Sequence, residues 1–272
     1  MRRGIAPIVG SRILDVERPR CAKRPIAVAP SMVTFRRRTI GRRIGAVSRI
    51  GKRVLVHLDS GDLMVFEPRM TGLVLLASPP TVEHLRFRVR LAGRRHKELL
   101  FWDRRGLGSV RLLSPAEFEC CYGVSKIGPD GLALDAAVLR ERLAHSSRAV
   151  KVALLDQRAI AGIGNLYAAE ILHLARIHPE RRCDELTPAQ WRRLAAATRE
   201  ILESAIYYEG STLADGTYRN ALNKSGGYQN HHRVYARAGK PCPSCRQGLI
   251  ERIVQAQRAT FFCPRCQKLP PQ

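Results

Sequence analysis

Hydrophobic and polar positions alternate along the first 115 residues of the chain. Three segments are apolar or alternate with a period of two, as β-strands do, and they are 54–60, 63–68 and 85–93. The tripeptide Ser60-Gly61-Asp62 predicts a turn between the first two. The segment 99–113, LLFWDRRGLGSVRLL, predicts a further strand pair around a glycine turn. Since no long helical period interrupts these strands, we expect a β-sandwich or a flattened barrel.

The period changes to three and four residues after Ser114-Pro115. Four segments have this helical spacing, and they are 134–145, 150–162, 165–177 and 187–210. The last has Thr187 at its N-cap position, Gln190 completes a capping box, and Gly210 marks its end. Residues 211–237 are rich in glycine and asparagine and place tyrosines among basic residues, so we expect a loop in contact with a ligand.

Two cysteine pairs follow this loop. Cys242 and Cys245 form one C-x2-C turn, Cys263 and Cys266 form the other, and 17 residues separate the two turns. This spacing predicts a closed, structural four-cysteine zinc site, with two disulfides or free thiols as the alternative. A hairpin this short buries little apolar surface, so the metal is expected to supply most of its folding free energy. The zinc then braces the loop that holds Arg258.

The charge of the chain narrows the choice of partner. Lys and Arg number 47 against 23 Asp and Glu, which gives a formal net charge of +24 and a pI near 10.8. Such an excess suits a polyanion, and nucleic acid is the leading prediction. An anionic membrane surface, or a basic surface that serves only solubility, is the alternative.

The sequence also bears on compartment. No stretch approaches the roughly 18 uncharged apolar residues that a membrane span needs. The start, MRRGIAPIVGSRIL, is interrupted early by charge and lacks a small-residue cleavage site, so we expect no signal peptide. The expected location is cytoplasmic and nucleoid-associated, where cysteines are more often thiols or metal ligands than disulfides.

Gly162 and Gly164 precede the helix expected from Asn165. A glycine turn before a helix N-terminus can present N–H groups and a favourable dipole to a phosphate. A plain turn between helices explains the same residues.

Several of these segments together resemble the formamidopyrimidine-DNA glycosylase family, which includes endonuclease VIII. The resemblance is densest in AGIGNLYAAEIL (161–172), GYQNHHRVYARAGKPCPSC (227–245) and QAQRATFFCPRCQ (255–267). RRGIAPIVGSRI, GKRVLVHL, RMTGLVLL and WDRRGLG match the family's N-terminal domain in order and spacing.

The resemblance implies a multidomain α+β protein. Its parts are expected to be an N-terminal β-sandwich (1–115), a helix–two-turn–helix domain (116–237) and a zinc finger with one structural Zn2+ (238–272). The implied function is base-excision repair. A glycosylase and apurinic-site lyase of this family flips an oxidised purine, 8-oxoguanine or formamidopyrimidine, from duplex DNA. An N-terminal proline amine forms a Schiff base at the sugar, and β,δ-elimination nicks the strand.

The family's first residues differ from those of this chain. Members begin, after the initiator Met, with Pro-Glu, whereas Met1 stands here at the edge of the segment that matches RRGIAP. We expect that the sequence starts at an internal methionine of a longer frame, and that this polypeptide as given lacks normal glycosylase activity. The alternative is a non-catalytic protein that binds damaged or abasic DNA.

The resemblance also implies roles for single residues. Lys52 matches a lysine of proton transfer and phosphate contact, and Arg258 matches the finger arginine that grips phosphates and assists elimination. The other carried-over positions are DNA contacts: His84, Met70, Arg105, Leu107, Arg148 and Asn165. Met70, Arg105 and Leu107 would fill the gap left by the flipped base, with Arg105 facing the orphaned cytosine. The family often has phenylalanine where Leu107 stands and a lysine near Ala214, so lesion preference is open.

A general zinc-ribbon RNA-binding protein is a third interpretation, which explains the charge and the cysteines but not Met70 or Arg105. A monomer that binds damaged double-stranded DNA and no membrane is the expected state. Cys21, Cys120, Cys121 and Cys183 fit no ligand set, and we expect buried thiols there.

Overall fold

The computed structural model describes residues 1–93, 95–213, 216 and 218–269. The chain divides into two compact units. The first unit comprises Met1–Gly123 and Tyr208–Gln229, and the second comprises Val124–Tyr207 and Asn230–Gln272. The three-part division expected from the sequence stays a prediction. Among the described residues, no helix is both long and apolar enough to span a membrane.

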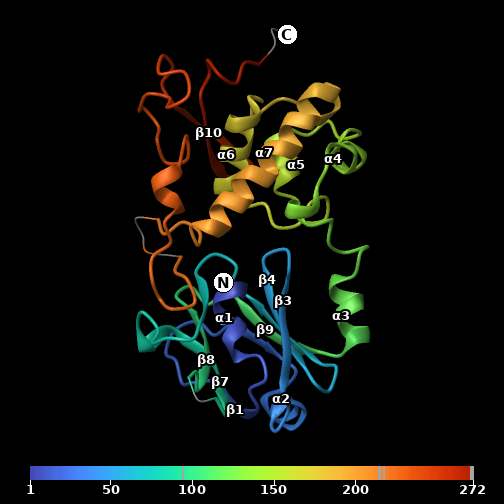
Figure 1. The fold of residues 1–272 in the computed structure, drawn as a ribbon, viewed down its shortest axis with the longest axis vertical. Helices are drawn as coiled ribbons and strands as arrows, with labels where there is room; N and C mark the ends of the chain where they lie inside the picture. Colours follow the sequence, from blue (N-terminus) through green and yellow to red (C-terminus); the bar gives the residue numbers. More distant parts are fainter. Residues whose placement is uncertain (94, 214–215, 217, 270–272) are drawn as a thin grey trace. The chain divides into compact units, whose positions relative to one another are not determined.

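Two sheets face each other in the first unit (Figure 1). The antiparallel four-stranded sheet has the order β1 (Ile13–Glu17), β7 (Leu85–Leu91), β8 (Glu98–Asp103), β6 (Gly72–Leu75). The five-stranded sheet has the order β2 (Ala27–Ala29), β9 (Ser109–Leu113), β5 (Leu63–Glu67), β4 (Arg53–Leu58), β3 (Ile44–Ile50). In this second sheet only the β2–β9 pair is parallel. The predicted β-sandwich is therefore confirmed.

Apolar side chains from both sheets form the core of the first unit. Phe66 of β5 contacts two rings of the opposite sheet, Phe87 of β7 at 6.4 Å and Phe101 of β8 at 5.9 Å between ring centroids. All three rings are fully buried. Because residues alternate faces along β8, Leu100 and Trp102 belong to a separate apolar cluster. The continuous apolar run 99–102 thus gives this strand two apolar faces, each in its own cluster.

The strands expected at 54–60, 63–68 and 85–93 are β4, β5 and β7. The expected pairing within 99–113 is wrong. Its two halves are β8 and β9, and they lie in different sheets because the chain crosses from one sheet to the other at the glycine turn.

The sequence did not reveal every helix of the first unit. Its helices are α1 (Arg2–Ile5), η1 (Ala6–Ile8), α2 (Met32–Thr39), η2 (Val82–His84), α3 (Pro115–Tyr122) and η5 (Tyr228–His231), the last of which runs into the second unit. The unexpected α2 begins at an N-cap, Ser31, whose hydroxyl accepts the Thr34 N–H. Phe35 buries one face of this helix against Phe87 at 5.1 Å.

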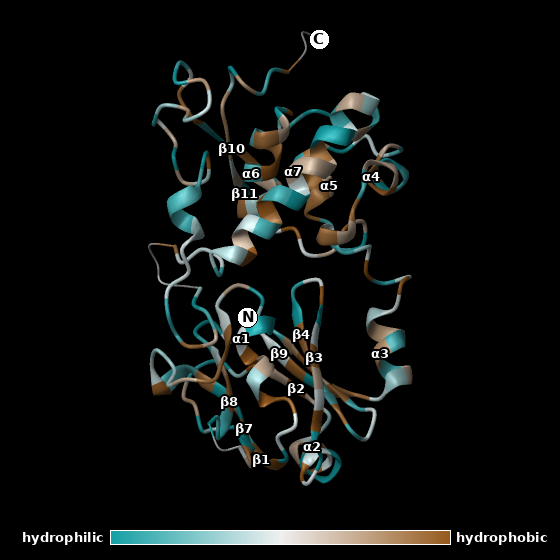
Figure 2. Cartoon of the chain, viewed as in Figure 1, coloured by the Kyte–Doolittle hydropathy of each residue, from teal (hydrophilic) through white to brown (hydrophobic). Residues whose placement is uncertain are grey.

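Helices dominate the second unit (Figure 1), and they are η3 (Gly131–Ala133), α4 (Ala136–Leu143), α5 (Val150–Leu154), α6 (Asn165–Ala175), η4 (Cys183–Glu185) and α7 (Pro188–Tyr207). The capping box of α7 is confirmed, since Gln190 N–H donates to Thr187 Oγ1 and Thr187 N–H donates to Gln190 Oε1. This helix ends at Tyr207, before Gly210. Alternating hydrophobic and hydrophilic bands mark it as a helix with one buried face (Figure 2).

Candidate functional site

The four cysteines of the C-x2-C turns lie together in the second unit. Their sulfur atoms are all within 4.8 Å of one another, with 3.8 Å between Cys242 and Cys266 and 3.7 Å between Cys245 and Cys263. A tetrahedral ion with zinc–sulfur bonds of about 2.3 Å needs sulfurs about 3.8 Å apart. A disulfide would bring two sulfurs to about 2.05 Å, and these cysteines are free thiols. The residues therefore fit one structural Zn2+ and not the disulfide alternative.

The cysteine hairpin packs against the helical part of its own unit. Its strands, β10 (Glu251–Gln255) and β11 (Arg258–Phe262), pair in antiparallel register. Cys242, Cys263 and Phe261 share an apolar cluster with Ala169 of α6. Gln267 donates to Ile177 O at 2.9 Å. The expectation that the metal supplies most of the folding free energy of the hairpin stays a prediction, and this packing supplies a further contribution.

A buried carboxylate of α6 orders the chain just before the hairpin. Glu170, which the sequence did not single out, accepts the N–H groups of Arg233, Val234 and Tyr235 at 2.9, 3.0 and 2.8 Å. Burial raises the pKa of Glu170, and the three N–H donors act against that rise. One side chain thus fixes where the polypeptide enters the cysteine turns.

Arg258 occupies the first position of β11, directly after a two-residue turn. Ala256 and Gln257 form this turn with φ of 44° and 61°, the backbone of a type I′ hairpin. The arginine is exposed. Asn165, at the first position of α6, donates from Nδ2 to the carbonyl of Ala259 at 2.9 Å. The residue that caps α6 is Gly164, so Asn165 ties the helix to the strand that bears Arg258.

The glycine turn before α6 is organised by a glutamine. Gly162 has φ of +100°, which favours glycine, and its N–H donates to Gln157 Oε1 at 3.0 Å. The amide of Gln157 in turn donates to the carbonyls of Leu155 and Ile163. The N–H of Gly162 is therefore already hydrogen-bonded. A phosphate bound here would have to take its N–H donors from the first turn of α6.

Lys151 of α5 is the main feature of this unit that the sequence did not reveal. It looks like a solvated lysine in VKVALL, yet its side chain is fully buried. Its Nζ has no hydrogen-bond partner among the residues that the structure describes. Burial, helped by the charge of Arg258, lowers the pKa of Lys151 from 10.5 to about 8. Only long-range packing creates this environment, so no local pattern could have indicated it.

Arg148 lies just before α5 and is engaged within the protein. Its Nη1 is 3.1 Å from Asp156 Oδ2, and its Nε donates to Ser146 Oγ. Burial acts to raise the pKa of Asp156, but hydrogen bonds from the Arg158 N–H and from Arg148 lower it more. The predicted DNA contact by Arg148 therefore stays a prediction. A DNA phosphate bound there would share the guanidinium with the carboxylate of Asp156.

The predicted gap-filling residues gather in the first unit. Met70 lies in the turn between β5 and β6 and is 63% exposed, so it is not part of the core. Arg105 Nη1 is 3.1 Å from Met70 Sδ. Leu107 lies two residues further along the same loop between β8 and β9 and is half-buried.

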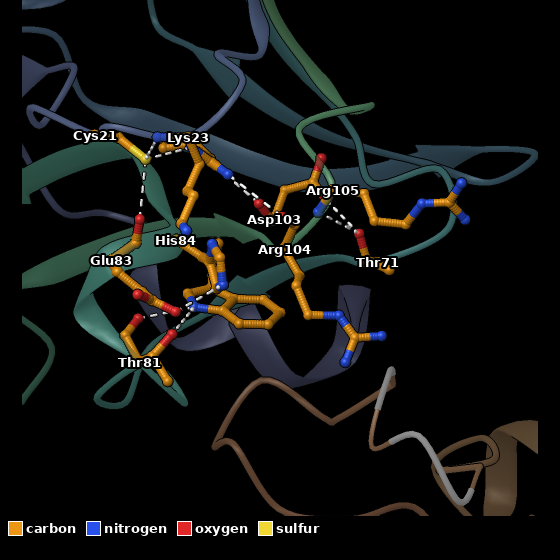
Figure 3. Close-up of polar contacts among 11 residues, drawn as sticks. Cys21, Lys23, Thr71, Thr81, Glu83, His84, Asp103, Arg104 and Arg105 are labelled. Atoms are coloured by element: carbon orange, nitrogen blue, oxygen red, sulfur yellow. Dashed lines mark hydrogen bonds and ion pairs between the residues drawn. The ribbon is translucent and has the colours of Figure 1, made fainter.

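A buried polar network holds the loop between β8 and β9 in place (Figure 3). The carboxylate of Asp103, which is fully buried, accepts the Arg105 N–H at 3.2 Å and the Gly108 N–H at 2.7 Å. Thr71 Oγ1 donates to the same carboxylate at 2.5 Å and accepts the Arg105 N–H at 3.1 Å. The network therefore joins the turn of Met70 to the loop of Arg105.

Lys52 and His84 lie beside different sheets of the first unit, Lys52 between β3 and β4 of the five-stranded sheet and His84 just before β7 of the four-stranded sheet. Lys52 is exposed in the Gly51-Lys52 turn between β3 and β4. His84 is 12% exposed by its side chain, lies 3.0 Å from the Glu83 carboxylate and packs edge-on against Trp102. Its Nδ1 is buried, with no hydrogen-bond partner in the described part of the chain.

The cysteines outside the cluster differ in their exposure. Buried thiols are right for Cys183 but wrong for Cys120 and Cys121, which are exposed, and for Cys21, which is half-exposed. The position without the expected lysine, Ala214, lies outside the described residues.

Models of known protein families match three parts of the chain. Residues 1–110 match the formamidopyrimidine-DNA glycosylase N-terminal domain, and residues 127–216 match the formamidopyrimidine-DNA glycosylase H2TH domain. Residues 239–269 match the zinc finger found in FPG and IleRS. The chain belongs to the formamidopyrimidine-DNA glycosylase family. The four-cysteine cluster is thus the zinc finger of a formamidopyrimidine-DNA glycosylase family member.

Individual relatives agree with this assignment. A formamidopyrimidine-DNA glycosylase of Chloroflexus aurantiacus is 43% identical over 247 residues, which cover 89% of this chain and 86% of the relative. One of Thermomicrobium roseum is 38% identical over 286 residues, covering 99% and 96%.

Solved structures of formamidopyrimidine-DNA glycosylases have the same fold. The Lactococcus lactis Fpg in complex with DNA that contains an abasic site superposes with a TM-score of 0.87 at 31% identity, covering 98% of this chain and 97% of that chain. The MutM (Fpg) protein from Thermus thermophilus gives 0.85 at 36% identity, covering 99% and 97%.

Proposed function

We propose that this chain is a base-excision repair DNA glycosylase and apurinic-site lyase that removes oxidised purines, 8-oxoguanine and formamidopyrimidine, from duplex DNA. One observation carries the proposal. The chain matches the Lactococcus lactis Fpg over 98% of its length, and that protein was solved on DNA with an abasic site. The same protein was also solved on DNA that contains Fapy-dG. The relatives that match most of the chain carry the glycosylase name, so a non-catalytic DNA-binding protein is not favoured.

The geometry of the first unit supports the gap-filling roles. Met70 and Arg105 are exposed and touch each other, so both side chains can enter the space of a flipped base. The guanidinium of Arg105 suits hydrogen bonding to the orphaned cytosine, and Leu107 suits a wedge beside it. Lys52 and His84 are proposed as backbone contacts, with Lys52 also in proton transfer.

The geometry of the second unit supports a phosphate grip. Arg258 is exposed at the end of a type I′ turn, and its planar fork can hold two phosphate oxygens. The zinc ion, bound by the four cysteines, supplies rigidity to this hairpin and takes no part in the chemistry. Asn165 aligns α6 with β11 and is proposed to contact the DNA backbone.

The charge of the chain supports damaged double-stranded DNA as its partner. A net charge of +24 favours a polyanion, and affinity should fall steeply with salt as counterions are released. We propose a monomer that works on the nucleoid in the cytoplasm.

Excision from a labelled duplex with 8-oxoguanine opposite cytosine tests the proposal, with undamaged duplex as control. With the family's Met-Pro-Glu start placed before the segment that begins at Met1, the expected result is base release followed by strand nicking, with a covalent complex trapped by borohydride, whereas the polypeptide as given should show little trapping. Selective binding without release or trapping would instead support the non-catalytic alternative. Equal affinity for damaged duplex, undamaged duplex and single-stranded RNA would exclude both and favour the RNA-binding interpretation.

A further inference from the structure

Arg86 of β7 is a buried arginine whose three hydrogen bonds within the described residues all go to neutral acceptors. It is 2% exposed. Its Nε donates to the carbonyl of Asp103 at 2.8 Å, and its Nη2 lies 3.5 Å from the carbonyl of Arg104. Its Nη1 donates to Cys21 Sγ. Within the described part of the chain, no carboxylate pairs with this guanidinium. Burying a cation without a carboxylate partner costs free energy of folding. This indicates that Arg86 serves a purpose other than stability.

The backbone of β7 aims this side chain at the loop between β8 and β9. The register with β8 passes from Leu85↔Trp102 to Phe87↔Phe101, so Arg86 is the additional residue of a β-bulge. Bulges redirect a side chain away from the regular alternation of a strand. The guanidinium consequently reaches the two carbonyls that begin the loop 103–108.

The loop 103–108 is thus held from two sides. Arg86 binds the carbonyl groups of residues 103 and 104, whereas the Asp103 carboxylate binds the next N–H groups. A side chain at Gly106, which has φ of +62°, would collide with the carbonyl of Arg24, so the segment before β2 presses against the same loop. These restraints fix the peptide planes on each side of Arg105.

We propose that Arg86 is a positioning residue that holds the loop 103–108 in the conformation presenting Arg105 to the base opposite the lesion. This inference rests on the proposed function. It concerns a side chain that takes no part in the chemistry and reaches DNA only through Arg105. Because the loop is ordered before DNA binds, little conformational entropy is lost when Arg105 makes its hydrogen bonds.

Cys21 extends the restraint to a second DNA-facing element. Its thiol donates to the carbonyl of Glu83 at 2.9 Å and accepts the Lys23 N–H at 3.4 Å (Figure 3). Glu83 belongs to η2, which also carries His84. Cys21 and Arg86 therefore connect the element of His84 to the loop of Arg105. An arginine is required because three acceptors in different directions need a planar fork, and a lysine offers one point charge.

The test compares Arg86→Lys with wild type in the full chain, using a matched control. Arg90→Lys is the control because Arg90 is an exposed arginine on the same strand. Fluorescence anisotropy measures affinity for three duplexes: a tetrahydrofuran abasic analogue opposite cytosine, the same analogue opposite adenine, and undamaged DNA. The quantity of interest is the ratio of the affinities opposite cytosine and adenine.

Wild type and Arg90→Lys should prefer cytosine, and Arg86→Lys should lower that ratio at least about fivefold, the lower end of what a well-placed bidentate arginine provides. Affinity for undamaged DNA should stay within about twofold, since phosphate contacts remain. In an Arg105→Ala background, Arg86→Lys should have no further effect on the ratio. A merely structural role would lower all three affinities together.

An unchanged ratio in Arg86→Lys, or an equal loss on all duplexes, overturns the proposal. Should Arg86→Lys fail to fold, Cys21→Val, which removes the Nη1 acceptor together with the bonds of the thiol to Glu83 and Lys23, replaces it under the same criteria, with Cys21→Ser expected to keep the wild-type ratio. If wild type itself does not prefer abasic over undamaged duplex, the proposed function fails, and the role of Arg86 falls with it. A wild type that binds abasic DNA but ignores the opposite base overturns the Arg86 proposal alone.

Discussion

Lys151→Met removes a buried ammonium group and should stabilise the second unit. The side chain of Lys151 is fully buried, and its Nζ lacks a hydrogen-bond partner among the described residues. Methionine is unbranched, is one side-chain atom shorter than lysine and fills most of the same space without a charge. The substitution therefore removes the cost of burying an ammonium while keeping most of the packing.

The size of the effect follows from the pKa of this lysine. Burial and the nearby Arg258 lower that pKa from 10.5 to about 8. A difference of about 2.5 in pKa corresponds to about 3.4 kcal/mol. Because Arg258 is exposed and its charge is screened by solvent, we expect a gain of about 1–3 kcal/mol in the free energy of unfolding at pH 7.

The gain should depend on pH in a defined direction. Between pH 8 and about 10.5, the unfolded wild-type chain binds a proton at Lys151 that the folded chain has lost. Wild-type stability therefore rises with pH across this window relative to the variant. The difference between Lys151→Met and wild type should be fully present below pH 8 and vanish above about pH 10.5.

Tryptophan fluorescence can isolate the unit in question. The chain has two tryptophans, Trp102 in the first unit and Trp191 on α7 in the second, so a Trp102→Phe background leaves Trp191 as the reporter. Urea unfolding is then followed from pH 6 to 10. Lys126→Met, at an exposed lysine of the same unit, serves as the control and should shift stability by less than about 0.5 kcal/mol. A Lys151→Met variant that is less stable than wild type at pH 7 would refute the reasoning, because it would mean that the ammonium has a stabilising partner.

Three further predictions concern the same unit. Cys245→Ser should lower bound zinc well below one ion per chain, measured by atomic emission, and weaken abasic-duplex binding; full affinity without zinc would contradict the bracing role. Arg258→Ala should reduce the slope of log affinity against log salt by about 0.9, whereas Arg258→Lys should keep the slope and lose affinity; identical behaviour of the two would show that only charge matters. Asn165→Ala should cost about 1 kcal/mol in urea unfolding followed by Trp191, through its lost hydrogen bond to β11. An unaltered midpoint would show that solvent replaces that bond.

Several features of the protein are readable from the chain alone because they depend on neighbours in sequence. Strands β4 and β5 follow from short apolar runs and β7 from alternation along the chain, and the start of α7 follows from Thr187 and Gln190. The zinc cluster follows from two C-x2-C turns, since two residues between thiols already bring them to one ion. Each of these patterns has a short-range geometric cause.

Tertiary structure alone decided the features that depend on distant segments. β8 and β9 separate into different sheets, although a single stretch of sequence suggested a hairpin. Lys151 loses its solvent only because other elements close over α5, and Arg86 meets Cys21 across 65 positions of the chain. Burial of a charge and the direction of a buried donor are properties of the packed surroundings. A local pattern contains neither, which is why the support beneath the loop of Arg105 became visible only in the folded chain.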